Sequence, residues 1–195
     1  MKKKSIIFVL VLSAFTAFGQ DKKDLGISIS GGILNSPYFY KSYRGNFFSV
    51  GFDYHISERH IIAANFLAGE HRYFENELSN VPSYDVDRNG RNATAIYKTF
   101  SVVYKYKLIN NNKFSLIPGI GAGVLTNTYV YPHKHGSSTV FNTSTWSDLA
   151  FPVTLDINYK VFKQWQLGLT SGFLIEPDFP ILALHIGPKL TYIIK

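Results

Sequence analysis

The chain has 195 residues, which is the size of a single domain, and it contains no cysteine. Only 17% of its residues are charged and 16% are aromatic, whereas a soluble domain has about 25% charged residues. The missing cysteine excludes disulfides and metal sites built from thiolates. The net charge is +7, of which three charges are lysines at positions 2–4; the rest of the chain has a mild excess of +4 and no basic block of the kind that nucleic-acid binding needs, so we expect no nucleic-acid partner.

The first nineteen residues have the layout of a secretory signal peptide. Lys2, Lys3 and Lys4 form a basic start, an uncharged apolar run covers residues 6–18, and Ala17 and Gly19 form a small-x-small cleavage pattern. The alternative, a membrane-anchoring helix, needs about 20 apolar residues and is disfavoured because charges follow from Asp21. We therefore expect a cleaved signal peptide over 1–19 and one domain over 20–195.

The rest of the chain alternates between apolar and small or polar residues, with no convincing helical period. In one clear example, Phe48, Val50 and Phe52 alternate with residues that include Ser49 and Asp53. Eight such segments are found, at 24–34, 46–56, 61–72, 95–108, 114–126, 148–161, 165–175 and 181–194. Segments of about ten residues are long enough for tilted strands to cross a bilayer.

The connections between these segments alternate in length. Short turns are expected at 57–60, 109–113 and 162–164, and longer loops at 35–45, 73–94, 127–147 and 176–180. Short turns at one end and longer loops at the other are typical of bacterial outer-membrane barrels. The sequence therefore predicts an all-β fold: a closed, up-and-down, antiparallel, eight-stranded transmembrane β-barrel behind a cleavable signal peptide.

A soluble β-sandwich or a secreted lipocalin-like barrel would also explain the alternation. The barrel is favoured because the less apolar face is rich in Gly, Ser and Thr, which suit the narrow interior of eight closed strands. Aromatic residues also recur near the predicted strand ends, where they would form girdles at the membrane interfaces. They are Phe47, Phe48, Tyr54, Tyr97, Tyr106, Phe114, Tyr159, Trp165 and Tyr192.

Several charged or ionisable residues fall on the predicted inner face. They are Asp53, Lys105, Lys107, Asp156, Lys160, His185 and Lys189. We expect a polar cluster in which Asp53 and Asp156 neutralise Lys105 and Lys189, because an unpaired charge in a narrow interior is costly. The alternative is that each charge is separately hydrated in a small water-filled lumen.

Catalytic and metal sites have weak support in the sequence. Glu70, His71, His133 and His135 could supply parts of an enzyme acting on lipid A, but no nucleophile motif accompanies them. His133 and His135 lack a third metal ligand. We therefore predict no catalytic residues, no metal and no cofactor.

The chain resembles the small eight-stranded outer-membrane proteins of Gram-negative bacteria, of the OmpX/OmpA-barrel type, and the outer-membrane β-barrel families common in Bacteroidetes. The resemblance rests on the cleavage region at 17–20, the turn at Asn110, Asn111 and Asn112, and the closing segment at 187–194. It implies a place in the outer membrane, with outer-membrane lipid, periplasmic chaperones and the barrel assembly machinery as partners.

The predicted role is therefore that of a non-catalytic outer-membrane protein, structural or interacting with other molecules through long extracellular loops. Three alternatives stay open at this point: a narrow solute pore, a lipid A-modifying barrel enzyme, and a secreted lipocalin-like ligand-binding barrel. The sequence names no surface ligand.

Overall fold

The computed structural model describes residues 24–37, 43–75, 91–135, 138–177 and 181–194, which form nine strands. The strands are β1 (Leu25–Asn35), β2 (Gly45–His55), β3 (His60–Glu75), β4 (Arg91–Tyr106), β5 (Ile109–Asn110), β6 (Phe114–His135), β7 (Ser138–Lys160), β8 (Trp165–Ile175) and β9 (Ala183–Ile194). Within these described ranges, no helix has the length and hydropathy needed to span a membrane.

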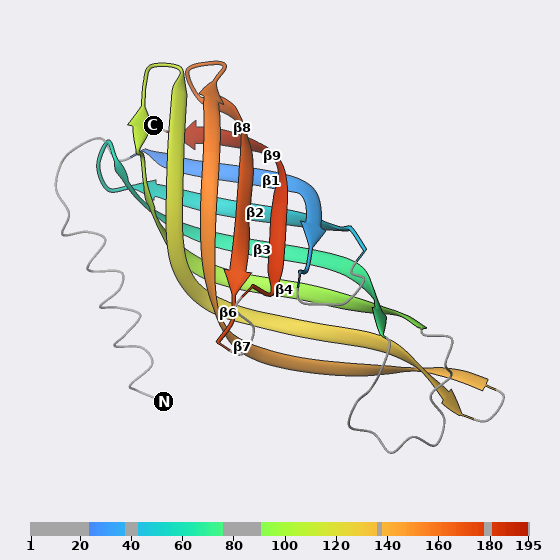
Figure 1. The fold of residues 1–195 in the computed structure, drawn as a ribbon. Coiled ribbons are helices and arrows are strands. Elements are labelled where there is room, and N and C mark those ends of the chain that lie inside the picture. Colours follow the sequence, from blue (N-terminus) through green and yellow to red (C-terminus); the bar gives the residue numbers. More distant parts are fainter. Residues whose placement is uncertain (1–23, 38–42, 76–90, 136–137, 178–180, 195) are drawn as a thin grey trace, which may run out of the picture.

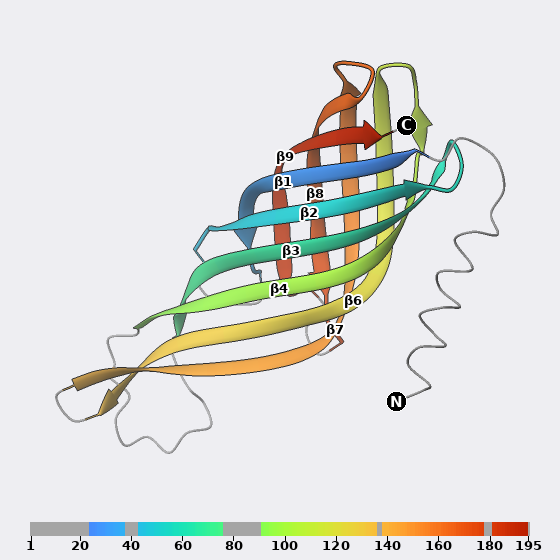
Figure 2. The same cartoon turned by 180° about the vertical axis from the view of Figure 1, so that it is seen from behind.

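Eight long strands close into one antiparallel barrel (Figures 1 and 2). Each strand pairs with its neighbour in the chain, β1 pairs with β9, and β4 pairs with β6. The two-residue strand β5 extends the β4–β6 turn by pairing with the start of β6. The prediction of a closed, up-and-down, eight-stranded barrel is confirmed. The predicted signal peptide lies outside the described residues and stays a prediction.

The period-two pattern determines which side chains enter the barrel. Along β9, His185, Lys189 and Thr191 are buried, whereas the intervening Leu184 and Ile186 are exposed on the outer wall. The other strands alternate in the same way: the outward residues at membrane depth are mostly apolar, and the inward face carries the small and polar residues together with some buried apolar ones. An apolar outer wall around a more polar interior is expected of a barrel whose outside meets hydrocarbon.

Glycines allow two strands to approach closely where the wall closes. A Cβ on Gly187 would clash with the Gly31 carbonyl oxygen, and one on Gly32 would clash with the Ile186 carbonyl oxygen. The β1–β9 register has no assigned pairs between Ser30–Lys189 and Ile33–Ile186. Figure 1 shows β1 bending before it ends. Any side chain at these glycines would push the two backbones apart.

An apolar cluster fills one part of the interior. It includes Leu34, Phe47, Tyr97, Leu125 and Leu182, all less than 9% exposed. The placement of Phe47 and Tyr97 in a membrane-interface girdle is therefore wrong. Both share the inner face with polar neighbours, since Phe47 alternates with Ser49 and Tyr97 with Thr99.

In the predicted segment 181–194, period-two alternation would put Leu182 outward with Leu184, and this is also wrong. It lies just before β9, where its N–H donates to the Leu174 carbonyl, and its side chain is fully buried. Lys160, predicted to face inward, is exposed at the short-turn end. In both cases the residue lies at or beyond a strand end, where the alternation no longer determines direction.

The predicted 127–147 loop is wrong, because most of it is strand. β6 continues to His135 and β7 begins at Ser138, with pairing from Val124–Leu149 out to His135–Ser138. We call residues 127–146 the β6–β7 hairpin; Val130 is its last residue paired with β4, and the part beyond Val130 projects from the barrel (Figures 1 and 2). The predicted 73–94 loop is shorter, since β3 reaches Glu75 and β4 starts at Arg91; its centre, 76–90, lies outside the described residues.

Candidate functional site

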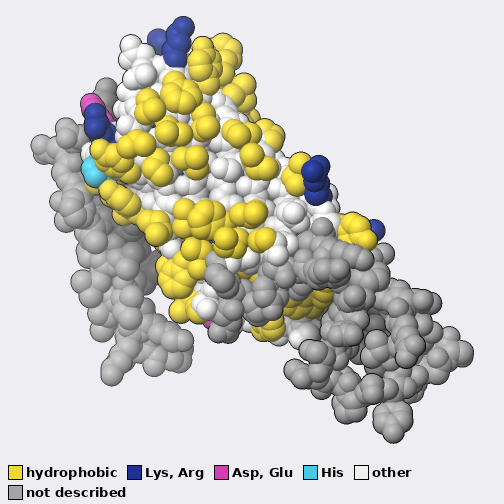
Figure 3. All heavy atoms as spheres, in the orientation of Figure 1, with side chains coloured by type: hydrophobic (Ala, Val, Ile, Leu, Met, Phe, Trp, Pro, Cys, Tyr) yellow, Lys and Arg dark blue, Asp and Glu magenta, His cyan; other side chains and the backbone are white. Residues whose placement is uncertain are grey.

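The outer wall of the barrel carries a continuous apolar belt. Its large exposed side chains include Phe52, Phe100, Val102, Ile120 and Leu155. Figure 3 shows hydrophobic side chains over the visible wall, with Lys and Arg toward the two ends. From Leu149 to Tyr159, outward apolar residues cover about 25 Å of bilayer depth at a strand tilt of about 40°. This height matches the apolar band of known transmembrane barrels.

Aromatic side chains border the belt at the short-turn end. His60 Nδ1 lies 2.6 Å from the Tyr104 hydroxyl, and the His60 ring contacts Tyr106 with 5.3 Å between centroids. Trp165 and Tyr192 form a second pair, with centroids 4.8 Å apart. Amphipathic rings of this kind favour the boundary between hydrocarbon and water.

The other boundary of the belt follows the strand register around the wall. Outward residues change from apolar to polar at Phe48–Asn46 on β2, at Val124–Thr126 on β6 and at Leu149–Ser147 on β7. Hydroxyl pairs continue beyond it, with Thr126 Oγ1 3.0 Å from Ser147 Oγ, and Thr128 Oγ1 3.2 Å from Thr145 Oγ1. The β6–β7 hairpin therefore begins where the apolar belt ends.

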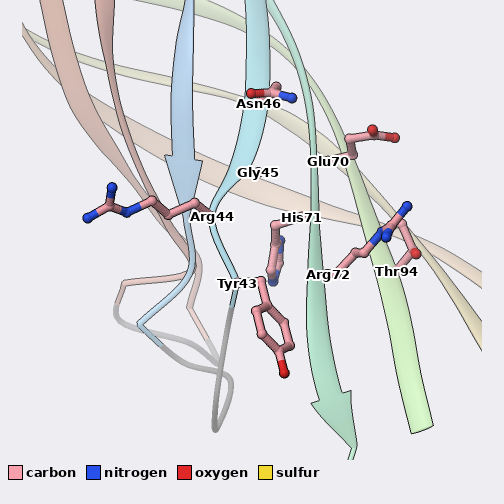
Figure 4. A pocket seen from close by; sticks show the side chains of 8 residues that line it. All are labelled: Tyr43, Arg44, Gly45, Asn46, Glu70, His71, Arg72 and Thr94. Atoms are coloured by element: carbon pink, nitrogen blue, oxygen red, sulfur yellow. The ribbon is translucent and has the colours of Figure 1, made fainter.

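A pocket of about 600 Å³ lies at this second boundary, on β2, β3 and β4 (Figure 4). Arg44, Asn46, Glu70 and Arg72 line it with exposed side chains. In Figure 4 the two guanidinium groups point in different directions, Arg72 toward Thr94 and Arg44 away from it. We call Arg44 and Arg72 the arginine rim, because both lie beyond this second boundary of the belt.

Four charged side chains meet inside the barrel at the level of the belt. Asp53 on β2, Lys105 on β4, Asp156 on β7 and Lys189 on β9 come from every second strand around the barrel, and each is at most 6% exposed. Inward residues from alternate strands share a layer in closed barrels. The structure thus brings together the four residues predicted to form a polar cluster.

We call these four residues the ion cluster. Its net charge is zero, and each lysine lies within 4 Å of both aspartates. Lys105 Nζ lies 3.0 Å from Asp53 Oδ1 and 3.1 Å from Asp156 Oδ2. Lys189 Nζ lies 2.7 Å from Asp156 Oδ2 and 3.9 Å from Asp53 Oδ2. The Thr170 hydroxyl donates to Asp156 Oδ1 at 2.6 Å, so Asp156 holds three partners and is the centre of the cluster. Nothing in the sequence pattern singled out Thr170.

The ion cluster and the apolar cluster leave little free space between them. A cavity of about 40 Å³ lies beside Lys105 and Lys189, next to Thr99 and Thr154. The hydroxyls of these two threonines are buried without a hydrogen-bond partner in the described part of the chain. A space of this size holds a few water molecules at most. Between the ion cluster and the apolar cluster, the interior is packed around a small polar void.

The candidate catalytic residues are not brought together. Glu70 is exposed on the outer face of β3, whereas His71 is buried on the inner face, where its ring stacks on Tyr97 with 5.4 Å between centroids. The side chains of His133 and His135 lie outside the described set. Among the described residues, no group of three or more His, Asp or Glu is placed to hold a metal ion.

Known structures with the same architecture come from outer-membrane proteins. The outer membrane protein OprG from Pseudomonas aeruginosa is 12% identical with a TM-score of 0.56, and the match covers 90% of this chain and 98% of that one. Ail, the attachment invasion locus protein of Yersinia pestis, solved with the heparin analogue sucrose octasulfate, is 11% identical with a TM-score of 0.52, covering 88% and 100%. The outer membrane protease OmpT from Escherichia coli is 7% identical with a TM-score of 0.55, covering 91% and 100%.

No protein-family model matches the chain, and no curated protein matches it in sequence. At these low identities the structural likeness establishes the fold. The narrower resemblance to Bacteroidetes families stays a prediction. In its fold, the chain is similar to the small β-barrel proteins of bacterial outer membranes, as the sequence resemblance predicted.

Proposed function

We propose that the chain is a non-catalytic integral outer-membrane protein that contacts a partner outside the cell through the β6–β7 hairpin. Export by the predicted signal peptide, and assembly by periplasmic chaperones and the barrel assembly machinery, belong to the same proposal. The apolar belt, the packed interior and the projecting hairpin each support one part of it.

The belt supports residence in a bilayer. An apolar wall of this height would be unstable in water, whereas in hydrocarbon the closed barrel leaves no unpaired sheet edge at membrane depth. With short turns on the periplasmic side, the hairpin and the arginine rim face outward. Arg44 and Arg72 then lie at the depth of lipid phosphate groups, which guanidinium groups bind well. Outer-membrane lipid is therefore the first proposed partner.

The packed interior supports a role other than solute transport or catalysis. Eight strands leave room for side chains and little else, and here the ion cluster and the apolar cluster occupy that room. Glu70 and His71 lie on opposite faces of β3, which separates the two groups that a catalytic site would need to bring together.

The observation that carries the interaction role is the unpaired edge of β7. Residues Ser138–Thr145 pair with β6 on one side, while pairing with β8 starts only at Phe151. In the described part of the chain, this stretch has no sheet neighbour on its second side. Exposed edges offer a row of N–H and C=O groups to which an extended segment of another protein can add as a strand. Val140 and Phe141 are 47% and 67% exposed and would give such a strand an apolar contact.

Removal of the hairpin tests this role. The variant joins Val130 to Thr143 through an Asn-Gly turn and so deletes 131–142, which keeps every β6 residue that pairs with β4. Peptides are selected from a displayed library on the wild-type protein in nanodiscs and depleted on the truncated variant. We expect extended peptides that bind the wild type and bind the truncated barrel at least about tenfold more weakly.

Backbone methylation is the matched control. N-methylation of the peptide amides that face β7 should abolish binding, whereas methylation of the alternate amides should leave it intact. Selected peptides that bind the truncated barrel as tightly as the wild type, or that tolerate both methylation patterns, would contradict strand addition.

A further inference from the structure

A second cavity opens at the short-turn end of the barrel. It has a volume of about 350 Å³ and lies between the ion cluster and the turns. Backbone hydrogen bonds tie adjacent turns together around it: Lys107 N donates to Arg59 O, and Lys160 N donates to Lys113 O, both at 2.8 Å. We call this cavity the mouth chamber. Its volume is in the range of small-molecule binding sites.

The chamber carries an excess of positive charge. Lys107, Lys113, Lys160 and Lys163 line it, and within the described ranges no carboxylate lies within 4 Å of their ammonium groups. Asp53, at its floor, is already neutralised within the ion cluster. Asp24 is the remaining acidic lining residue, which leaves a formal charge of +3.

The floor of the chamber also holds buried polar groups without partners. Asn158 and Thr191 are 5% and 3% exposed, and Asn158 Oδ1 and Thr191 Oγ1 make no hydrogen bond in the part of the chain that the structure describes. A hydroxyl rotates freely, and the amide can turn to present its NH₂ group. Both side chains can thus donate to an acceptor in the chamber, which would remove the cost of leaving them unpaired.

Lys107 is the most enclosed of the four lysines. Its Nζ lies 3.4 Å from His55 Nδ1, which can accept a hydrogen bond but supplies no negative charge while the ring is neutral. Burial lowers the pKa of Lys107, more than the distant carboxylates of Asp24, Asp53 and Glu58 raise it. An anion beside this ammonium group would offset the cost of burying it.

We propose that the mouth chamber binds a small soluble polyanion that carries phosphate groups. Several lysines around one cavity suit a compact multivalent charge, since each ammonium group acts as a point charge toward phosphate oxygens. The chamber opens along the barrel axis rather than through the apolar wall, so its ligand comes from the aqueous phase. Under the proposed function this phase is the periplasm, but binding itself does not depend on that orientation.

Pyrophosphate is the probe for calorimetric titration of the full barrel in a zwitterionic detergent at low salt. We expect saturable binding that weakens with added salt, because exposed lysines contribute to it. Lys107→Met should weaken binding about tenfold, as expected for the loss of a charge-assisted contact. Lys160→Met should also weaken it. Lys98→Met makes the same charge change on the outer wall and should leave affinity within about twofold of wild type.

A spectroscopic readout keeps the test independent of variant folding. In the wild-type protein, pyrophosphate should shift the amide signals of Asn158 and Thr191, and leave those of the β6–β7 hairpin unchanged. Citrate is the carboxylate arm of the experiment, and equal affinity for citrate would overturn the assignment to phosphate. No binding of pyrophosphate, or equal weakening in Lys98→Met, would overturn the site itself while leaving the surface role untouched.

Discussion

Replacing Asp156 by asparagine should lower the free energy of unfolding of the barrel by about 3–5 kcal/mol. Asp156 accepts hydrogen bonds from Lys105, Lys189 and Thr170, and it is 2% exposed. The variant leaves Asp53 alone to balance two buried ammonium groups, and removing one partner of a buried ion pair leaves an uncompensated charge. Urea unfolding from lipid vesicles, followed by tryptophan fluorescence, measures the change.

Two further variants separate the ion cluster from a general effect of substitution. Glu70→Gln removes an exposed carboxylate on the outer face of β3 and should change stability by less than about 0.5 kcal/mol. Asp156→Asn combined with Lys189→Met removes a pair of opposite charges and should recover part of the loss. If the double variant lost more free energy of unfolding than the two single variants lose together, the neutral ion cluster would be the wrong account of this interior.

Replacing Val102 by arginine should destabilise the protein in vesicles by about 2–4 kcal/mol. Val102 is 53% exposed in the middle of the apolar belt and is paired with Ala64 and Ala122, so it has no protein partner for a charge. An arginine there would put a guanidinium group into hydrocarbon. The free energy of folding into vesicles, compared with wild type, gives the magnitude.

The matched control is Thr128→Arg, on the outward face of β6 beyond the belt. The same side chain there meets water, and we expect a change within about 0.5 kcal/mol. If the apolar belt faces hydrocarbon, the cost of an arginine must depend on its depth in the bilayer. Similar losses of stability for Val102→Arg and Thr128→Arg would therefore contradict the belt.

The sequence predicted the barrel and the ion cluster from a single physical rule. Successive side chains on a strand point to opposite faces, so placing Phe52 outside puts Asp53 inside, and the same holds for Leu155 and Asp156. An even number of tilted strands then brings inward charges to one layer. Thr170 was missed because a threonine on a glycine-bearing strand carries no signal of pairing with a carboxylate on β7.

The same rule could have corrected the aromatic assignment. Phe47 and Tyr97 lie on the inner faces of β2 and β4, so they fill the core rather than forming a girdle. Nearness to a strand end does not place an aromatic ring in a girdle, because the face on which the residue lies decides what the ring touches.

The β6–β7 hairpin was missed because its outward face is polar on both sides of the turn. Thr128, Thr145 and Ser147 fall in the predicted loop when apolar alternation is the criterion. Threonine nevertheless favours strands, and cross-strand hydroxyl pairs stabilise them. A sheet that leaves the membrane loses its apolar face but keeps its hydrogen-bond ladder, so the pattern ends before the strand does.

Collision accessibility of spin labels tests most directly whether the apolar belt faces hydrocarbon. The chain has no cysteine, so single-cysteine variants at Phe100, Val102 and Thr128 each carry one label. In vesicles, labels at Phe100 and Val102 should collide with oxygen far more than with a water-soluble nickel chelate, and the label at Thr128 should show the reverse. A nickel chelate that reaches Val102 as readily as Thr128 would mean that the wall faces water, and a membrane-spanning barrel would be excluded.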